Sequence, residues 1–319
     1  MIMKSHFNVT WFVWILFIFD QTSSVCFCPN ATWNPNATTF ANSSIIGGGP
    51  YGFSISSNNI VYIPNQSNKY LLVLSETSLT PLRNIPLNSS DVVSIFARED
   101  DSIYIGYTWN SISGIRKLTS NLSSSDSVLE VWSRCRDIFI DIRDDIYCSL
   151  DYAHQVIKKS LNNTSDPIRV IAGTGTASSA SNMLYNPNGI FVDTNFDLYV
   201  ADHGNNRIQF FPLDQSNGIT VAGSGSLTVT IALNYPCGII LDDDKYLFIS
   251  ERIRNRVIRS GPYGFQCLFG CSGGGSATDQ LNYPMLIKFD MFGNIFVADS
   301  SNNRLQKFVL MTNSCSKLN

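Results

Sequence analysis

Acidic and basic side chains recur at one fixed spacing in the C-terminal half of the chain. The pairs, each five residues apart, are Asp202 with Arg207, Glu251 with Arg256 and Asp299 with Arg304. Each acid ends a short apolar run and each arginine opens the next, so the turn between them brings the two side chains together. They could form a ring of charges that grips a ligand, or structural turn clamps that satisfy nearby backbone groups. Repetition favours the clamp, because a catalytic residue has no reason to recur in every copy.

The turns between these charges supply the candidate ligand contacts. The candidates are His203, Asn205, Asn206, Arg252, Arg254, Asn302 and Asn303. After the first 24 residues only His154 and His203 remain as histidines, which is too few for a competent zinc site. The sequence has no GxSxG motif, no phosphate-binding loop and no paired acids in a glycosidase-like setting. We therefore predict no catalytic residue, no metal ligand and no cofactor, although the sequence leaves open whether the abundant Asp, Asn and Glu converge on a calcium ion.

The elements that position these turns are short strands. Residues 185–213 contain three apolar runs, Gly189–Asp193, Leu198–Asp202 and Arg207–Phe211, separated by Asn, Asp and Gly turns. β-branched and aromatic residues fill the runs, which predicts an antiparallel meander. The same phrase returns from Tyr235 and from Tyr283.

These copies resemble NHL repeats, each of which forms one blade of a β-propeller. Fainter copies lie upstream, and the markers are Pro50, Val92, Cys135, Pro187, Pro236 and Pro284. The resemblance implies an all-β, six-bladed NHL-type propeller over residues 25–319. The last copy stops after its third strand, near Leu305–Met311, so we predict that Ala37–Ala41 supplies the fourth. Pairing of this N-terminal strand with the last blade would close the ring and remove an open edge.

The first 24 residues have the pattern of a signal peptide. Lys4 precedes the apolar run Val9–Phe19, which is too short to span a bilayer, and small residues follow at Thr22–Ser24. An uncleaved membrane anchor is the alternative. Eight Asn-x-Ser/Thr sequons after the first 24 residues support secretion and predict glycosylation at Asn30, Asn36, Asn42, Asn65, Asn88, Asn121, Asn162 and Asn163.

Eight cysteines, an even number, also suit an oxidising compartment. Ring closure would bring the chain ends together, so we expect Cys28 (or Cys26) to pair with Cys315. Two further groups share predicted blades and leave their connectivity open: Cys135 with Cys148, and Cys237 with Cys267 and Cys271. No pair has the CxxC spacing of a zinc site.

The charge balance narrows the class of partner. A net charge of −3 without a basic segment argues against nucleic acid. We predict a secreted glycoprotein that binds a protein or other extracellular ligand through the loops of one propeller face. The alternative, which the resemblance implies, is a metal-dependent lyase or hydrolase like the peptidyl-hydroxyglycine amidating lyase or the lactonase-like propellers. The sequence leaves the oligomeric state open.

Overall fold

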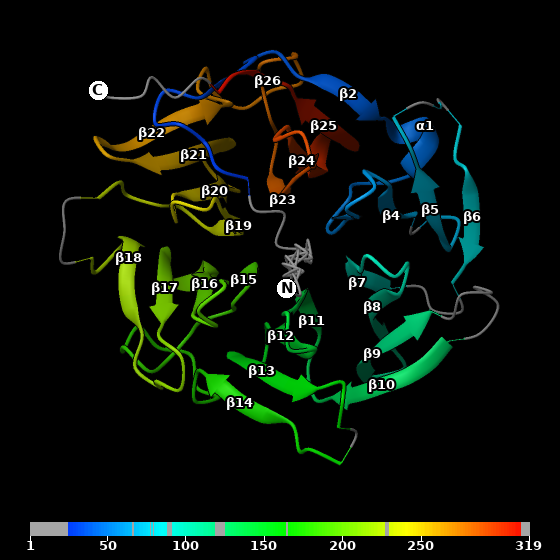
Figure 1. Cartoon of the computed structure of the whole chain (residues 1–319), viewed down its shortest axis with the longest axis vertical. Helices are drawn as coiled ribbons and strands as arrows, with labels where there is room; N and C mark the ends of the chain where they lie inside the picture. Colours follow the sequence, from blue (N-terminus) through cyan, green and yellow to red (C-terminus); the bar gives the residue numbers. More distant parts are fainter. Residues whose placement is uncertain are drawn as a thin grey trace, which may run out of the picture.

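The repeats fold into six antiparallel sheets that stand around a central axis (Figure 1). The structure, a computed structural model, describes residues 25–313 except 66, 77, 79, 88–90, 119–124, 164 and 227–229. The predicted signal peptide, Cys315 and the sequon residues Asn88 and Asn121 lie outside the described residues. Each sheet has four strands, and the first strand of a blade lies nearest the axis (Figure 1). The predicted all-β, six-bladed propeller is therefore confirmed.

Consecutive strands pair within each blade. Blades one to three contain β3 (Ser54–Ile55), β4 (Val61–Asn65), β5 (Tyr70–Leu74) and β6 (Arg83–Pro86); β7 (Asp91–Ala97), β8 (Ile103–Trp109), β9 (Ile112–Leu118) and β10 (Ser125–Val131); β11 (Cys135–Ile140), β12 (Asp145–Leu150), β13 (Gln155–Ser160) and β14 (Arg169–Ala172). Blades four to six contain β15 (Ile190–Val192), β16 (Leu198–Asp202), β17 (Arg207–Phe211) and β18 (Ile219–Gly223); β19 (Pro236–Leu241), β20 (Leu247–Glu251), β21 (Arg256–Gly261) and β22 (Gly264–Phe269); β23 (Pro284–Phe289), β24 (Ile295–Asp299), β25 (Arg304–Phe308) and β2 (Thr38–Ala41).

The core consists of apolar layers between neighbouring blades. All five residues of β24, Ile-Phe-Val-Ala-Asp, are buried, as expected for a strand that is covered on both faces. One layer joins Phe96 of blade two, Phe139 of blade three and Phe191 of blade four, with ring centroids 5.7 and 5.3 Å apart. Packing between blades therefore fixes where each turn lies.

The inner strands approach each other closely enough to require glycine at two positions. A Cβ on Gly189 would lie 2.4 Å from the carbonyl oxygen of Cys237 in the next blade. A Cβ on Gly238 would lie 2.8 Å from the backbone nitrogen of Ile287. Both distances are shorter than carbon–heteroatom contacts allow, so any larger residue would push the inner strands apart.

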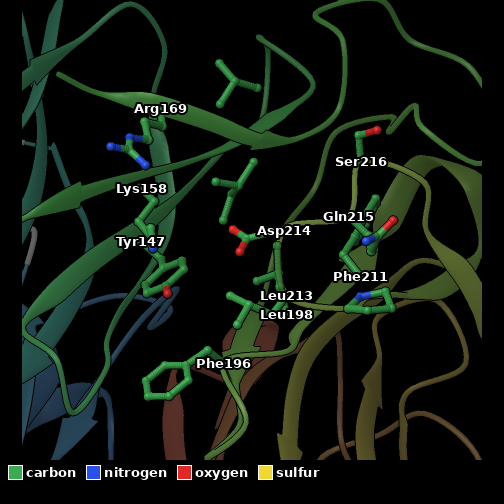
Figure 2. Close-up of a pocket in the computed structure, with 13 residues that line it drawn as sticks. Tyr147, Lys158, Arg169, Phe196, Leu198, Phe211, Leu213, Asp214, Gln215 and Ser216 are labelled. Carbon is green, nitrogen blue, oxygen red and sulfur yellow. The ribbon is translucent and has the colours of Figure 1, made fainter.

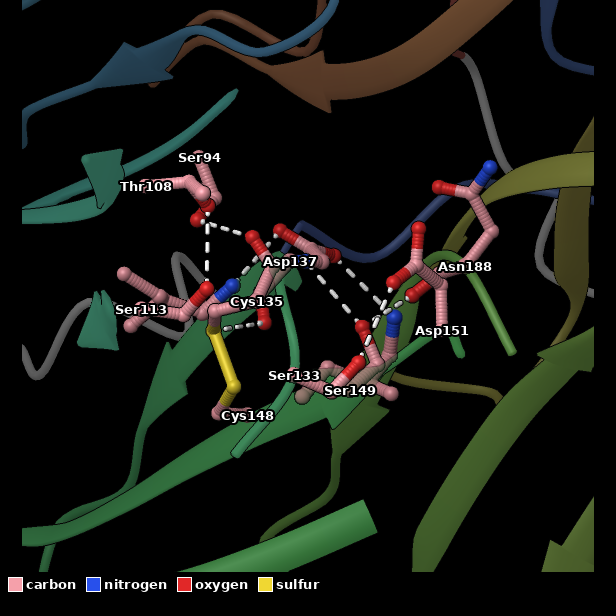
Figure 3. The surroundings of a disulfide bond; sticks show 12 residues. Ser94, Thr108, Ser113, Ser133, Cys135, Asp137, Cys148, Ser149, Asp151 and Asn188 are labelled. Carbon is pink, nitrogen blue, oxygen red and sulfur yellow. Dashed lines mark hydrogen bonds between the residues drawn. A yellow bond between two sulfur atoms is a disulfide. The ribbon is translucent and has the colours of Figure 1, made fainter. Parts of the chain in front are cut away.

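Polar side chains link the inner strands where blades three and four meet. The Asp137 carboxylate accepts a hydrogen bond from the backbone N–H of Ile190 at 3.0 Å. The Ser149 hydroxyl donates to the carbonyl of Asn188 at 2.5 Å (Figure 3). Burial raises the pKa of the Asp137 carboxyl group, and the two backbone N–H groups that it accepts from partly offset this effect.

Two disulfides lie within blades. Cys135 pairs with Cys148 across β11 and β12 (Figure 3), and Cys267 pairs with Cys271 at the end of β22. Cys237 is a buried free thiol, so its inclusion among the disulfide candidates was wrong. It lies on β19 at the inner edge of the sheet. Cys267 lies on β22 at the outer edge, about 14 Å away at three strand spacings.

The N-terminal strand closes the ring as predicted. β2 pairs antiparallel with β25, and Thr38 lies opposite Lys307 and Thr39 opposite Gln306 (Figure 1). A second, unpredicted pairing joins β1 (Thr32–Trp33) to β26 (Leu310–Thr312). The described N-terminal and C-terminal strands are therefore paired twice.

Aromatic side chains anchor the segment that precedes this closure. Phe27 is fully buried, and its ring centroid lies 4.9 Å from that of Trp33, 5.8 Å from that of Phe248 and 5.1 Å from that of Phe289. The indole N–H of Trp33 donates to the carbonyl of Gly293 at 2.9 Å. These contacts attach the chain start to blades five and six.

Cysteines flank Phe27 on both sides. Cys28 is disulfide-bonded and Cys26 is a free thiol, which resolves the choice between them. The expected partner, Cys315, lies outside the described residues, so its pairing with Cys28 stays a prediction.

Among the residues that the structure describes, helix is confined to three short pieces: α1 (Ser43–Ile46), η1 (His203–Asn205) and η2 (Ser300–Asn302). Asn42 caps α1 with its side chain, which accepts from the N–H of Ser44. Within the part of the chain that the structure describes, no helix has the length and apolar character to cross a bilayer.

Sequon asparagines differ in exposure. Among the described acceptors, Asn30, Asn36, Asn42, Asn162 and Asn163 are exposed. Asn65 is only 3% exposed; its amide donates to the carbonyl of Ile45 at 3.1 Å and accepts from the N–H of Asn68 at 3.0 Å. It is the one described acceptor that the folded protein does not present to solvent.

Candidate functional site: the mouth face of the propeller

Antiparallel order decides which connections share a face. A first strand begins at the end of the blade where the second strand finishes, so the second-to-third-strand turns lie beside the loops that lead into first strands. We call this set of turns and loops the mouth face, since it surrounds one end of the axis. The candidate contacts all lie there: His203, Asn205 and Asn206 between β16 and β17, Arg252 and Arg254 between β20 and β21, Asn302 and Asn303 between β24 and β25.

The regularly spaced charges form an ion pair in each turn. The pairs are Asp202–Arg207 at 2.7 Å, Asp299–Arg304 at 2.6 Å, and Glu251–Arg256. In blade four the remaining guanidinium nitrogens of Arg207 donate to the carbonyls of Ser179, Ala180 and Met183. The arginine thus ties the loop before its blade to the turn within it.

The acid of each pair also binds the loop that leads into its blade. One oxygen of Asp202 pairs with Arg207, and the other accepts from the backbone N–H of Tyr185 at 2.7 Å. Asp299 accepts from the N–H of Asn282 at 2.7 Å in the equivalent way. These carboxylates are fully buried and their hydrogen-bonding capacity is used inside the protein, which fits a clamp rather than a ligand grip.

Three of the candidate asparagines are also occupied by the loops. The Asn205 amide donates to the carbonyl of Ser178 and to Asp202, both at 2.8 Å. Asn302 makes the matching bonds in blade six, to Gly275 at 2.8 Å and Asp299 at 2.9 Å. Asn206 accepts from the backbone N–H of Tyr235 at 2.7 Å.

The two candidate arginines of blade five differ in whether the loops bind their side chains. Arg254 donates to the carbonyl of Ala232 at 2.7 Å, whereas no hydrogen bond of the Arg252 side chain exists among the described residues. The mouth-face loops therefore leave the side chains of Arg252 and Asn303 available, whereas one ring nitrogen of His203 lies 3.0 Å from the carbonyl oxygen of Pro236.

Aromatic side chains, which the sequence analysis did not select, are the largest exposed groups on this face. Eight of them are between 38% and 69% exposed: Tyr51, Tyr70, Trp109, Trp132, Tyr152, Tyr185, Tyr235 and Tyr283. A tyrosine precedes the marker proline in each of the last three copies, so the sequence did contain a sign of these exposed rings. From one sequence alone, however, this tyrosine cannot be distinguished from the other residues that define the repeat.

Three of these rings, those of Tyr185, Tyr235 and Tyr283, pack against a cation or a histidine from the previous blade. His203 lies edge-on to Tyr235 at 4.8 Å, and the Arg252 guanidinium lies 5.1 Å from the ring centroid of Tyr283. Tyr235 and Tyr283 have left-handed backbones, with φ of 54° and 52°. A bulky residue adopts this conformation only where its surroundings impose it. Here a turn asparagine of the previous blade binds each backbone N–H.

Charge is distributed unevenly between the two faces. On the mouth face, blades three to six contain more arginines than acids. There are seven arginines (Arg134, Arg136, Arg207, Arg252, Arg254, Arg256, Arg304) and five acids (Asp151, Asp202, Glu251, Asp279, Asp299). In the same four blades, the turns between first and second strands, on the opposite face, contain eight acids and two basic residues. A chain with a net charge of −3 therefore presents a mouth face with an excess of positive charge.

His203 and Cys237 meet on the mouth face although 34 residues separate them. Nδ1 of His203 lies 3.0 Å from the carbonyl oxygen of Pro236 and 3.5 Å from Sγ of Cys237. Because a carbonyl only accepts, Nδ1 carries the proton. Burial, with the nearby Arg252 and Arg136, lowers the pKa of His203 to about 4, so the ring is neutral near pH 7.

The same burial argues against a cysteine nucleophile. It raises the pKa of Cys237 to about 12, whereas a catalytic cysteine needs a lowered pKa to form its thiolate. The described residues contain no group of three His, Cys, Asp or Glu side chains that could hold a metal ion.

Replacing His203 with glutamine should reduce the loss of unfolding free energy as the pH falls from 7.5 to 5. The folded pKa of about 4 lies below the unfolded value of 6.5, so the contribution of His203 is complete above pH 6.5 and is lost as the pH falls toward 4. Between pH 7.5 and 5 the unsubstituted chain should lose about 2 kcal/mol more than His203→Gln. Urea unfolding at both pH values measures this, and parallel losses would contradict a buried neutral histidine.

Two cavities differ in place and chemistry. One of about 180 Å³ opens on the mouth face beside Arg252, Tyr283 and Tyr51. A larger one of about 270 Å³ lies between blades three and four. Figure 2 shows Lys158 and Arg169 on one wall of the larger cavity with Asp214 facing them, and most of its lining is apolar. None of the candidate contacts lines the larger cavity.

No protein-family model and no curated protein matches the chain. Solved propellers do align with it. An auxiliary nutrient binding protein from Bacteroides thetaiotaomicron aligns with a TM-score of 0.65 and 14% identity, over 91% of this chain and 75% of that one. A streptogramin B lyase aligns with a TM-score of 0.60 and 16% identity, over 86% and 97%.

A catalytically inactive form of virginiamycin B lyase from Staphylococcus aureus, solved with quinupristin, aligns with a TM-score of 0.59 and 16% identity, over 85% and 98%. At these identities the likeness extends to the fold alone, since one propeller fold supports many functions.

Proposed function

We propose that this chain is a secreted, NHL-type propeller protein that binds an extracellular ligand on its mouth face. The observation that supports this most is the set of eight exposed aromatic side chains gathered there. Aromatic rings stabilise a fold by burial, and exposed ones concentrated on one face are typical of a binding surface.

Ion pairs hold the loops of the mouth face that carry the exposed tyrosines. The clamps Asp202–Arg207, Glu251–Arg256 and Asp299–Arg304 attach each loop to its turn, so the tyrosines that follow the loops keep their positions. A rigid set of loops binds with less loss of conformational freedom than a flexible set.

Secretion is part of the proposal. Two disulfides and five exposed sequon asparagines among the described residues are in line with an oxidising, glycosylating compartment. The apolar segment at the start of the chain supplies the expected signal peptide. One of the aligned propellers is named an auxiliary nutrient binding protein, and this lends support to a binding role.

Thermal unfolding with a panel of sugars, amino acids, peptides and small acids tests the proposal. We expect at least one compound to raise the melting temperature and to protect the turns around His203 and Arg252 from hydrogen exchange. Tyr152→Ser should weaken this stabilisation. Tyr263→Ser should not, because Tyr263 is 99% exposed on the third-to-fourth-strand turn of blade five, on the opposite face. Protection confined to the cavity around Leu213, or equal losses in both variants, would refute the mouth face.

A lyase is the second candidate, because the neutral imidazole of His203 leaves Nε2 free to accept a proton. Incubation of the protein with quinupristin, followed by mass spectrometry, separates the two. We expect no new product. Turnover that His203→Gln abolishes would replace binding with catalysis as the function.

A further inference from the structure

We propose that the ligand of the mouth face carries an oxyanionic group, a carboxylate, sulfate or phosphate, next to an aromatic or apolar group, and that Arg252 binds the oxyanion. This inference rests on the proposed function and names the chemistry of its ligand.

Arg252 lacks the acceptor that its burial calls for. Its Nε is buried and has no hydrogen-bond partner among the described residues. The adjacent carboxylate of Glu251 pairs with Arg256 and, at 3.9 Å, with Arg254. Arg256 and Arg259 also have a buried nitrogen without an acceptor, yet each of them pairs with a carboxylate. A buried guanidinium N–H is expected to have an acceptor, and an oxyanion from outside the chain would provide it.

Space for such a group exists beside Arg252. The cavity of about 180 Å³ is lined by Arg252, Tyr51, Tyr283, Met285, Ser300 and Asn303. Since one water occupies roughly 30 Å³ of liquid, the cavity has room for a charged group and part of a ring. Tyr51, Tyr283 and Met285 supply the apolar walls, and the Tyr283 ring also holds the guanidinium, 5.1 Å away.

Neighbouring charges favour an anion over a cation. Arg134 and Arg136 share one carboxylate, Asp151, at 2.7 and 3.0 Å, so they leave a positive excess. Arg252 and Arg136 both act on His203, which is neutral near pH 7 and adds no opposing charge. Arginine presents a planar fork of N–H groups that fits two oxygens of one oxyanion.

Four aryl compounds of similar size test the inference on the full chain: benzoate, benzenesulfonate, phenyl phosphate and neutral benzamide. At matched ionic strength we expect at least one anion to bind, measured by calorimetry, and benzamide to bind at least tenfold more weakly. The anion that binds best identifies the oxyanion. Arg252→Gln should weaken its binding by roughly tenfold to a hundredfold, as expected for a charged hydrogen bond, and Arg252→Lys should weaken it less. Arg83→Gln makes the same charge change on the exposed outer strand β6 and should bind like the unsubstituted chain.

Equal affinity for benzamide, unchanged binding by a folded Arg252→Gln variant, or no binding of any anion would overturn the inference. The proposed function would survive if Tyr152→Ser still removed the stabilisation by a neutral compound of the wider panel. It would fail separately if no compound protected the mouth face.

Discussion

Replacing Asp202 with alanine should lower the free energy of unfolding by about 3–5 kcal/mol, the loss typical of a buried ion pair deprived of one partner. Asp202 is fully buried, and its carboxylate binds Arg207, Asn205 and the backbone of Tyr185. Its removal leaves the Arg207 guanidinium, which is itself buried, without its counter-charge.

Urea unfolding of Asp202→Ala measures the loss. Asp126→Ala is the matched control, because Asp126 is exposed on the outer strand β10, and its effect should stay within about 0.5 kcal/mol. A loss below about 1 kcal/mol for Asp202→Ala would show that the clamps do not hold the loops.

A chain that begins at Ser43 should lose cooperative folding altogether. It lacks β2, which completes blade six, and the buried side chains of Phe27 and Trp33. Large aromatic residues each contribute about 3–5 kcal/mol when buried, so the two together approach the whole stability of a typical domain, about 5–15 kcal/mol. The truncation also exposes β25 as an open edge.

Circular dichroism and urea unfolding of the two truncated chains check this. A chain that begins at Val25 keeps every contact of β1 and β2 and serves as the control. The point variant Phe27→Ala should show an intermediate loss of about 3–5 kcal/mol. An unchanged urea midpoint for the chain that begins at Ser43 would contradict closure by the N-terminal strand.

The fold could be predicted from the sequence because its information is local. Alternating apolar runs specify strands, and repetition of the phrase from Tyr185 at Tyr235 and Tyr283 specifies blades. Closure followed from a missing fourth strand in the last copy. The pairing of β1 with β26 could not be predicted, because strands of two and three residues carry no period.

The candidate site was predicted less completely, because it depends on contacts between blades. Single-sequence spacing located the turns, yet it did not distinguish Asn205, which the loop occupies, from Arg252, which has no acceptor among the described residues. The approach of His203 to Cys237 joins two blades and has no signature along the chain. The exposed tyrosines were visible as part of the repeat, but their exposure is a property of the assembled face.

One crystal structure of the chain with the tightest-binding aryl anion would test the central claim directly. We predict density for the anion on the mouth face, with its oxygens within hydrogen-bond distance of Arg252 and its ring against Tyr51 or Tyr283. Density in the cavity between blades three and four, with the mouth face empty, would contradict the account.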